Sequence, residues 1–435
     1  METRKIEKLT GPVDIVASVP GSKSILARAM VLSALSEGKC VITNAVLSED
    51  GKVMLNALRD LGFQVYYNSS LKVVRVFGKG GEIPKKEATV YVGSAGTAAR
   101  FLTAMLAFSD GTYVINGSRQ LTARPMAGLI KALREAKIEI TCLGKEGHLP
   151  IKIKGRRPKE DEKLRLYVDA SESTQFVSGL MMVLACLPNE SMIAATNMNR
   201  SSYINMTMRM ITLFGGEIEG AGGIFKIAPG KTYEVKDMVA EPDVSSACYL
   251  YAIPVLLGGR AKVPGVGMYS LQGDLKFLDL LTTLGAKISS DDEIILSAFK
   301  NNMGIEDMII DMSDFSDQVA TMAVIAACKR GITRINNIGH IRKQESDRIA
   351  VIAQNLEKCG IRCTEGKDFL AIEGGMPHGA VINPHGDHRI AMAFSILGLY
   401  TGDMVIKDPD CVGKSFENFF EEIDKIKNVE EEAGE

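Results

Sequence analysis

Leu58-Arg-Asp-Leu-Gly62-Phe-Gln-Val65 is a segment that ends a helix and begins a strand. Apolar residues at helical spacing lead up to it, and a short alternating stretch follows it. Glycine after the last helical turn fits a left-handed C-cap, a backbone conformation that glycine adopts without strain. We therefore expect a helix that ends near residue 60 and a strand that begins directly after Gly62.

This helix-glycine-strand segment recurs along the chain. The other copies are Leu133–Ile140, Ile211–Ile218, Leu281–Ile288 and Leu356–Cys363. Equivalent positions 62, 137, 215, 285 and 360 are separated by 75, 78, 70 and 75 residues, and only position 137 is not glycine. Such segments are common in α/β proteins, but the nearly constant spacing indicates a repeated unit.

Each interval contains the pattern of two helices and several short strands. Apolar residues at helical spacing predict helices over 24–35, 50–60, 96–107, 125–136, 173–187, 204–214, 245–257, 273–284, 316–328, 345–358, 387–398 and 415–425. β-Branched stretches at 73–76, 151–153 and 294–296 predict strands between them. The chain is therefore expected to be an α/β protein of about six strand-rich units rather than a single Rossmann sheet.

Length and charge narrow the class of protein. A chain of 435 residues is long enough for two or more domains. Its 51 basic and 53 acidic residues give a net charge of −2, which argues against a surface that coats nucleic acid or an anionic membrane. The first residues lack the apolar core of a signal peptide, and runs such as 179–187 are too short to span a bilayer. We expect a soluble, cytoplasmic protein.

Cysteine and histidine are not arranged as metal ligands. The eight cysteines are scattered singly, apart from Cys359 and Cys363, and the five histidines show no HExxH spacing. Small buried thiols in a reducing compartment explain the cysteines more simply. No metal site is expected.

Polar and charged clusters precede many of the expected helices. They include Pro20-Gly-Ser-Lys-Ser24, Gly93-Ser-Ala-Gly-Thr97, Ser171-Glu-Ser-Thr-Gln175, Asp314-Phe-Ser-Asp317, Gln344-Glu-Ser-Asp-Arg348, Gly386-Asp-His-Arg389 and Gly413-Lys-Ser415. Helix capping accounts for Ser, Thr and Asp at such positions, and it is sufficient for Asp243–Ser246. A helix N-terminus also binds anions through its free N–H groups and partial positive charge.

Several of these helix starts also contain basic residues, which helix capping does not require. Lys23 stands at a helix entrance, and Arg124 precedes Pro125, so we expect Arg124 in an extended segment before a helix. Arginine binds carboxylate and phosphate oxygens in a bidentate fork. Each of these residues alone is more often a surface ion-pair partner, but together they indicate a small substrate with several negative charges. The glycines around Lys23 do not form a Walker loop, because position 16 is valine.

The ordered set of motifs resembles the 5-enolpyruvylshikimate-3-phosphate synthase family over nearly the whole chain, from residue 20 to residue 415. The resemblance implies a two-lobed inside-out α/β barrel, with three βαβαββ repeats in each lobe. It implies one lobe at 21–240 and another formed by 1–20 and 241–435, with the active site in the cleft between the lobes.

The resemblance also implies roles for individual residues. Residues expected to bind phosphoenolpyruvate are Lys23, Gly96, Arg124, Gln175, Arg348, Arg389 and Lys414. Residues expected to bind shikimate 3-phosphate are Lys23, Ser24, Arg28, Ser173, Thr174, Gln175, Arg200, Asp317 and Gln344. The catalytic assignments are Asp317 and Glu345 for proton transfer, with Lys23 a further candidate. The family reaction is an addition followed by an elimination, and it needs no cofactor and no metal.

Three positions depart from the family pattern. Ser94 replaces the usual Asn, and Phe101 replaces the Pro of many members. Gln344 occupies a position that is often lysine in the family and is expected to contact the substrate 3-phosphate. We hypothesise that Arg200 or Lys343 supplies the missing charge. Gly96, without a side chain, predicts sensitivity to phosphonate analogues of phosphoenolpyruvate such as glyphosate.

Three other functions fit the sequence less well. UDP-N-acetylglucosamine enolpyruvyl transferase shares the fold, but it typically has a Lys-Asn pair near the start and a loop cysteine. Here the pair is Lys23-Ser24, and residues 116–125 contain no cysteine. A non-catalytic relative is disfavoured because candidates for the charged roles are present, with Gln344 the one departure. An RNA-end-processing enzyme is disfavoured because the charge is balanced and the sequence has no basic stripe. We expect a monomer that binds the two small-molecule substrates, no nucleic acid and no membrane.

Overall fold

The computed structural model describes residues 2–198, 202–230, 232–290, 292–300 and 302–428. The chain divides into two compact units. The middle unit is Gly21–Ala240, and the split unit combines Met1–Pro20 with Glu241–Glu435. Within the described residues each unit contains three β-sheets, and five of these six sheets share one topology.

The middle unit has three four-stranded sheets, each with one parallel pair followed by two antiparallel pairs. The first is β14 (Met238–Val239), β3 (Glu37–Thr43), β5 (Val73–Lys79) and β4 (Gln64–Asn68). The second is β6 (Glu87–Tyr91), β7 (Thr112–Asn116), β9 (Ile151–Lys154) and β8 (Glu139–Cys142). The third is β10 (Leu164–Asp169), β11 (Ser191–Thr196), β13 (Ile224–Ile227) and β12 (Ile218–Ala221).

The split unit repeats this arrangement. One sheet is β2 (Val13–Val16), β15 (Gly259–Lys262), β17 (Ile294–Ala298) and β16 (Lys287–Ser290). Another is β18 (Met308–Asp311), β19 (Gly331–Asn336), β21 (Phe369–Gly374) and β20 (Arg362–Glu365). The last has three described strands, β22 (Val381–Ile382), β23 (Met404–Lys407) and β1 (Thr3–Ile6). Strands β1 and β2 from the start of the chain therefore complete two sheets whose other strands come from the second half of the chain.

Strand register places one apolar face of each sheet inward. Cys40 pairs with Val76, which pairs with Val65 on the next strand, and all three side chains are buried. Because side chains alternate between the two faces of a strand, this register buries every second residue.

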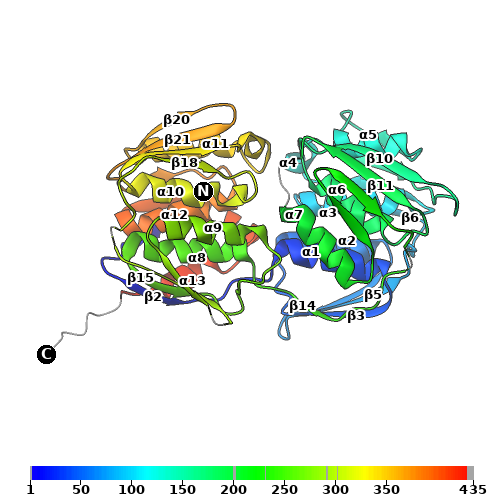
Figure 1. Ribbon diagram of the computed structural model, residues 1–435, viewed down its shortest axis with the longest axis horizontal. Helices are drawn as coiled ribbons and strands as arrows, with labels where there is room; N and C mark the ends of the chain where they lie inside the picture. The colour runs from blue at the N-terminus through cyan, green and yellow to red at the C-terminus, as the bar shows by residue number, and fades with distance from the viewer. Residues whose placement is uncertain (1, 199–201, 231, 291, 301, 429–435) are drawn as a thin grey trace. The chain divides into compact units, whose positions relative to one another are not determined.

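Helices lie inside the sheets. The inner helices of the middle unit are α1 (Lys23–Leu35), α3 (Gly96–Ala107) and α6 (Gln175–Leu184), and those of the split unit are α8 (Val244–Leu257), α10 (Val319–Cys328) and α12 (His388–Thr401). Every residue of α8 is buried. A helix that is apolar all round must be enclosed, and Figure 1 shows α8, α10 and α12 between the β2–β15 sheet and the β18–β21 sheet. Sheets outside and helices inside are the inside-out arrangement.

Amphipathic helices and short turns complete the units. The remaining α-helices are α2 (Glu49–Asp60), α4 (Arg119–Thr122), α5 (Ala127–Glu135), α7 (Ser202–Leu213), α9 (Lys276–Thr283), α11 (Arg348–Lys358) and α13 (Phe419–Asp424). The 3₁₀ turns are η1 (Gly273–Leu275), η2 (Ser316–Gln318), η3 (Gly339–Lys343) and η4 (Pro409–Lys414).

The recurring helix-glycine-strand segment has one structure at all five places. Residues 62, 137, 215, 285 and 360 all have positive φ, between 63° and 91°. The residue after each donates its N–H to the carbonyl five positions earlier, as Phe63 does to Leu58 at 3.0 Å. This is the Schellman motif, and Lys137 adopts it without being glycine. The repeat prediction is confirmed at each copy.

Three local predictions were wrong. Helix α11 begins at Arg348 rather than 345, because the Asp347 side chain caps it by accepting from the Ala350 N–H. The segment predicted as a helix over 415–425 holds the shorter α13, which follows η4. Arg124 lies in a bend rather than an extended segment, because its N–H donates to the Leu121 carbonyl at the end of the unforeseen α4.

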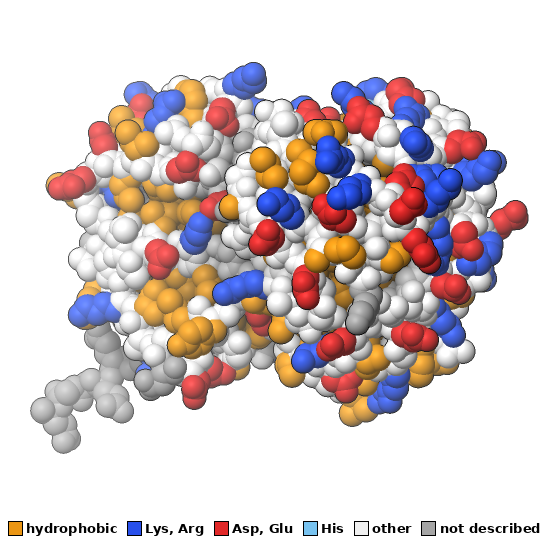
Figure 2. All heavy atoms as spheres, turned by 45° about the vertical axis from the view of Figure 1, so that its right-hand side comes forward, with side chains coloured by type: hydrophobic (Ala, Val, Ile, Leu, Met, Phe, Trp, Pro, Cys, Tyr) orange, Lys and Arg blue, Asp and Glu red, His pale blue; other side chains and the backbone are white. Residues whose placement is uncertain are grey.

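On the face drawn in Figure 2, basic and acidic side chains are interspersed. Among the described residues, none of the helices combines the length and the apolar character that crossing a membrane would need.

Candidate active site

Lys23 opens the inner helix α1 of the middle unit, where Ser22 caps the helix by accepting from the Ile25 N–H. The Lys23 Nζ lies 3.2 Å from Oδ2 of Asp50 on α2. The Asp50 side chain is 8% exposed and the Lys23 side chain 22%, so the carboxylate anchors the ammonium while leaving part of it accessible. Asp50 is a supporting residue that the sequence analysis did not single out.

Arg28 lies one turn further along α1 and is fully buried. Its guanidinium donates to Thr207 Oγ1 at 2.8 Å and to the Ser24 carbonyl at 2.9 Å. The Arg28 Cζ stands 5.2 Å from the centre of the Phe101 ring. Burial lowers the pKa of Arg28 to about 10, which leaves the side chain charged at neutral pH. The structure places Arg28 where it fixes the first turn of α1, including Ser24.

Gly96 begins α3 in close contact with two guanidinium groups. A Cβ at this position would lie 2.8 Å from Nη1 of Arg100 and 3.2 Å from Nη1 of Arg124. A side chain here would therefore have to displace one of the guanidiniums. The structure brings together Gly96 and Arg124, which the sequence analysis had assigned to the same substrate.

Gln175, the first residue of α6, joins this group. Its Oε1 accepts from Arg100 at 2.8 Å, and its Nε2 donates to Thr97 Oγ1 at 3.0 Å. Ser173 accepts the Gln175 backbone N–H at 3.2 Å, and Thr174 is buried beside it. The starts of α3 and α6 thus meet, which joins two helix N-termini with their free N–H groups and partial positive charge. Arg200 lies outside the described residues.

Arg348, at the start of α11 in the split unit, is the centre of a buried ion cluster. Its Nε lies 2.8 Å from Oδ2 of Asp387, and its terminal nitrogens lie 2.8 Å from Glu345 and 3.2 Å from Asp317. The Arg348 side chain is 3% exposed and Asp387 is fully buried. Burial alone would lower the pKa of Arg348, but the carboxylates of Asp387, Glu345 and Asp317 together raise it above its ordinary value.

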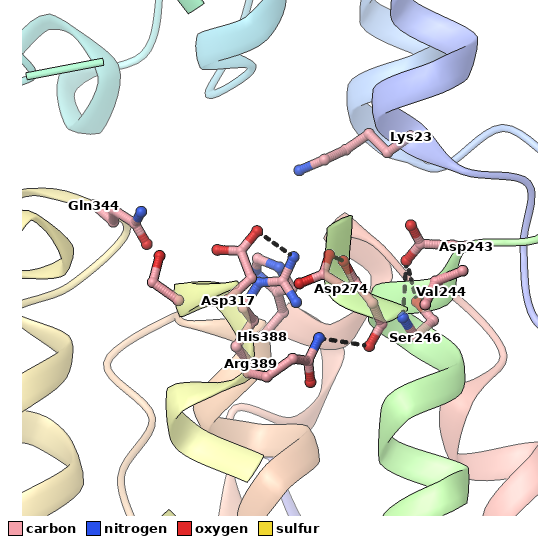
Figure 3. Close-up of polar contacts among 12 residues, drawn as sticks. Lys23, Asp243, Val244, Ser246, Asp274, Asp317, Gln344, His388 and Arg389 are labelled. Atoms are coloured by element: carbon pink, nitrogen blue, oxygen red, sulfur yellow. Dashed lines mark hydrogen bonds and ion pairs between the residues drawn. The ribbon is translucent and has the colours of Figure 1, made fainter. Parts of the chain in front are cut away.

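Two further cations complete the cluster. Arg389, in the first turn of α12, donates to Asp317 Oδ2 at 3.0 Å, a contact drawn in Figure 3. Lys414, at the end of η4, donates to Glu345 Oε1 at 3.1 Å. Each of the two carboxylates assigned to proton transfer therefore contacts Arg348 and one other cation. Buried charges arranged in this way satisfy one another when no substrate is bound.

Gln344 contributes an amide to the same cluster. Its Oε1 accepts a hydrogen bond from Arg348. Lys343, one residue earlier, is exposed at the end of η3. The Gln344 amide therefore helps to orient Arg348. A lysine at position 344 would instead place a second positive charge beside the Arg348 guanidinium.

Asp387 connects Arg348 to the start of α12. It caps α12 by accepting from the Arg389 N–H at 3.0 Å, and it accepts from Ser346 Oγ at 2.9 Å as well as from Arg348. The sequence motif Gly386-Asp-His-Arg389 contained Asp387, but no role was assigned to that residue. Among the described residues, no group of three or more His, Cys, Asp or Glu side chains could hold a metal ion.

Comparison with known proteins identifies the family. The model of the EPSP synthase (3-phosphoshikimate 1-carboxyvinyltransferase) family matches residues 3–423. The chain belongs to this family. It is 35% identical over 423 residues to the 3-phosphoshikimate 1-carboxyvinyltransferase of Nostoc punctiforme, covering 97% of this chain and 98% of that protein. It is 34% identical to the Methanospirillum hungatei protein of the same name, covering 96% of each chain.

Solved structures agree with the family and the fold. The EPSP synthase of Acinetobacter baumannii matches with a TM-score of 0.81 at 25% identity, covering 98% of this chain and 99% of that one. The enolpyruvyl transferase NikO of Streptomyces tendae matches with a TM-score of 0.76 at 16% identity, covering 98% of each chain, which is a likeness of fold. The two-lobed inside-out α/β fold is thereby confirmed, and the UDP-N-acetylglucosamine enolpyruvyl transferase reading is not favoured.

Proposed function

We propose that this protein transfers the enolpyruvyl group of phosphoenolpyruvate to the 5-hydroxyl of shikimate 3-phosphate and releases phosphate. The observation that carries the proposal is the buried cluster of the split unit. Asp317 and Glu345 lie there among three cations at the ends of helices and turns, in a member of the EPSP synthase family. The pathway would be the one that leads through chorismate to the aromatic amino acids.

The cations suit the charges of the donor. Phosphoenolpyruvate has a carboxylate and a phosphate, and arginine binds both in a bidentate manner. We assign Arg348, Arg389 and Lys414 of the split unit to this substrate. From the middle unit we assign Lys23, Gly96, Arg124 and Gln175.

The acceptor requires a second set of groups. We assign shikimate 3-phosphate to Ser24, Arg28, Ser173, Thr174, Gln175, Arg200, Asp317 and Gln344, with Lys23 near both substrates. Direct binding by Arg28 would have to compete with four acceptors inside the protein, which are Thr207 Oγ1, Ser178 Oγ and the carbonyls of Ser24 and Tyr203. An active site shared by both units remains a prediction.

The chemistry follows from two carboxylates held by cations. Asp317 accepts the proton of the 5-hydroxyl as that oxygen attacks C2 of the enol, and C3 receives a proton from Glu345 or Lys23. The tetrahedral adduct then loses phosphate, and the proton on C3 returns to the protein as the enol double bond re-forms. Phosphoenolpyruvate that binds Arg389 and Lys414 would replace Asp317 and Glu345 as their partners, which leaves each carboxylate with Arg348 as its one cationic partner in the cluster and makes its other side available for proton transfer. Fixed cations stabilise the charge on the departing phosphate.

Several further properties remain predictions. These are the monomeric state, the cytoplasmic location, the independence from cofactors and metals, and the absence of nucleic-acid or membrane partners. Inhibition by glyphosate, competitive with phosphoenolpyruvate, is expected from the bare Gly96.

Mass spectrometry of the products tests the proposed reaction. The protein is incubated with phosphoenolpyruvate and an equimolar mixture of shikimate 3-phosphate and UDP-N-acetylglucosamine. The expected result is an enolpyruvyl group on shikimate 3-phosphate alone. An enolpyruvyl group on the nucleotide sugar, or on neither acceptor, would contradict the proposal.

A further inference from the structure

Asp274 is a buried acid that the proposed mechanism does not use. It lies in η1 with 5% of its surface exposed. Its Oδ2 accepts from Ser245 Oγ at 2.5 Å, and its Oδ1 has no hydrogen-bond partner within the part of the chain that the structure describes. A buried carboxyl with one unsatisfied oxygen costs free energy, so its presence calls for a functional explanation.

A short series of contacts connects Asp274 to Asp317. The Ser245 carbonyl, in the first turn of α8, accepts from Gln318 Nε2 at 3.1 Å. Gln318 is fully buried, accepts from Thr321 Oγ1 at 3.1 Å, and directly follows Asp317 in η2. The turn that presents Asp317 is therefore anchored to the backbone of Ser245, whose side chain binds Asp274.

Asp274 also faces the charges of the ion pair itself. Figure 3 shows Asp274 beside Asp317 and Arg389. Two carboxyl groups, from η1 and η2, thus lie near the Arg389 guanidinium, which pairs with Asp317 at 3.0 Å. One guanidinium neutralises one carboxylate, so the second carboxyl is most stable with a proton on it.

We propose that Asp274 is a positioning residue for the enolpyruvyl transfer, one that holds a proton so that Asp317 remains the carboxylate paired with Arg389. The proposal rests on the proposed function. When Asp274 is neutral, Arg389 is free to exchange Asp317 for the anionic donor. When Asp274 is ionised, a second negative charge opposes that donor at the same guanidinium.

The surroundings of Asp274 support a proton held near neutral pH. Burial, followed by the charge of Asp317, raises the pKa of Asp274 to about 7, against the opposing effect of Arg389. Other titratable groups nearby are Asp243, which caps α8, Cys248 on α8, whose Sγ contacts the Asp274 carbonyl, and the buried His388 of α12, which Figure 3 shows in the same group. The charge of Asp243 also raises the pKa of Asp274, in the same direction as that of Asp317.

The decisive variant is Asp274→Asn, which imitates the neutral acid and keeps an oxygen for Ser245. The measurement is kcat/KM for phosphoenolpyruvate from about pH 6 to about pH 9, expressed as the ratio of variant to wild type. Ionisation of the substrates cancels in this ratio. We expect a ratio near one at low pH that rises about tenfold above pH 7, since one carboxylate charge is worth about one pKa unit of interaction. Asp279→Asn, at an exposed position of α9, is the matched control and should give a flat ratio.

Thermal unfolding supplies a readout that does not depend on turnover. A carboxyl whose pKa is raised on folding loses its stabilising effect as pH rises from its unfolded value of 3.8 through about 7. The Tm of Asp274→Asn minus that of wild type should therefore increase over this window and level off above it. Asp274→Ala, which also removes the acceptor of Ser245, should lower kcat. Asp274→Asn, which keeps that acceptor, should have a kcat close to that of wild type.

The outcomes separate this proposal from the proposed function. A flat kcat/KM ratio in a protein whose wild type turns over overturns the positioning role and leaves the function intact. Equal loss of kcat in the Ala and Asn variants also overturns it. Absence of turnover in wild type overturns the proposed function instead, while the Tm series still tests whether Asp274 holds a proton.

Discussion

Removal of the Asp387 carboxylate is the most informative single perturbation of the ion cluster. Asp387 is fully buried and accepts from Arg348 Nε at 2.8 Å, Ser346 Oγ at 2.9 Å and the Arg389 N–H at 3.0 Å. The Arg348 side chain is 3% exposed. The variant Asp387→Ala leaves the three cations of the cluster, Arg348, Arg389 and Lys414, with only two carboxylates. It also removes the cap of α12.

The magnitude follows from these contacts. Removal of one partner of a buried ion pair costs about 3–5 kcal/mol of unfolding free energy, and loss of a helix cap costs about 1 kcal/mol. Arg348 keeps Asp317 and Glu345 as partners, so the ion-pair cost should fall at the lower limit. We expect Asp387→Ala to lose about 4 kcal/mol in total. Asp387→Asn keeps the capping oxygen and should lose less.

Urea unfolding followed by far-ultraviolet circular dichroism measures this loss, since the chain has no tryptophan for fluorescence. The matched control is Asp424→Ala, which removes an exposed partner of Arg4 and should cost at most about 1 kcal/mol. Equal losses in Asp387→Ala and Asp424→Ala would refute the reasoning that the buried cluster depends on Asp387.

Three further predictions concern the middle unit and the substrate phosphate. Gly96→Ala should raise the KM for phosphoenolpyruvate and weaken inhibition by glyphosate, because a Cβ would displace a guanidinium, and steady-state inhibition kinetics measure both. Phe101→Leu should lose about 1 kcal/mol of unfolding free energy beyond its packing loss, because its ring faces Arg28; a double-mutant cycle with Arg28→Met isolates that contact. Arg200→Ala should raise the KM for shikimate 3-phosphate if this residue supplies the charge that Gln344 lacks, whereas an effect only in Lys343→Ala would transfer that role to its neighbour.

Much of the fold could be predicted because it depends on local chemistry. The five C-cap segments fixed where helices end and strands begin, and glycine at four of them reports the left-handed backbone directly. The inside-out arrangement of helices and sheets came from the resemblance to the family, not from the pattern of any one helix. Helix starts were harder to predict, since α11 begins where Asp347 caps it, and motif residues alone do not distinguish Asp347 from Glu345. Strand β2 pairs with β15, which is distant in the chain, and no local sequence pattern predicts this pairing.

Only some residues of the candidate site could be predicted from the sequence. Charged residues at helix starts were visible in the sequence because their type and position are unusual for caps. Their supports were not visible. Asp50 resembles an ordinary first-turn acid of α2, and Asp274 resembles an ordinary surface acid until the structure shows it buried. Ion pairing and burial are long-range properties, so they emerge only when the helices are packed together.

Phosphate release from phosphoenolpyruvate tests the central claim most directly, with and without shikimate 3-phosphate, for wild type and Lys23→Met. Lys131→Met, which removes an exposed lysine of α5, is the control. We predict release that requires shikimate 3-phosphate, is unchanged in the control, and falls at least about a hundredfold in Lys23→Met, because one fixed electrostatic group is lost from the transition state. Release at the wild-type rate in Lys23→Met, or release that ignores shikimate 3-phosphate, would contradict the account.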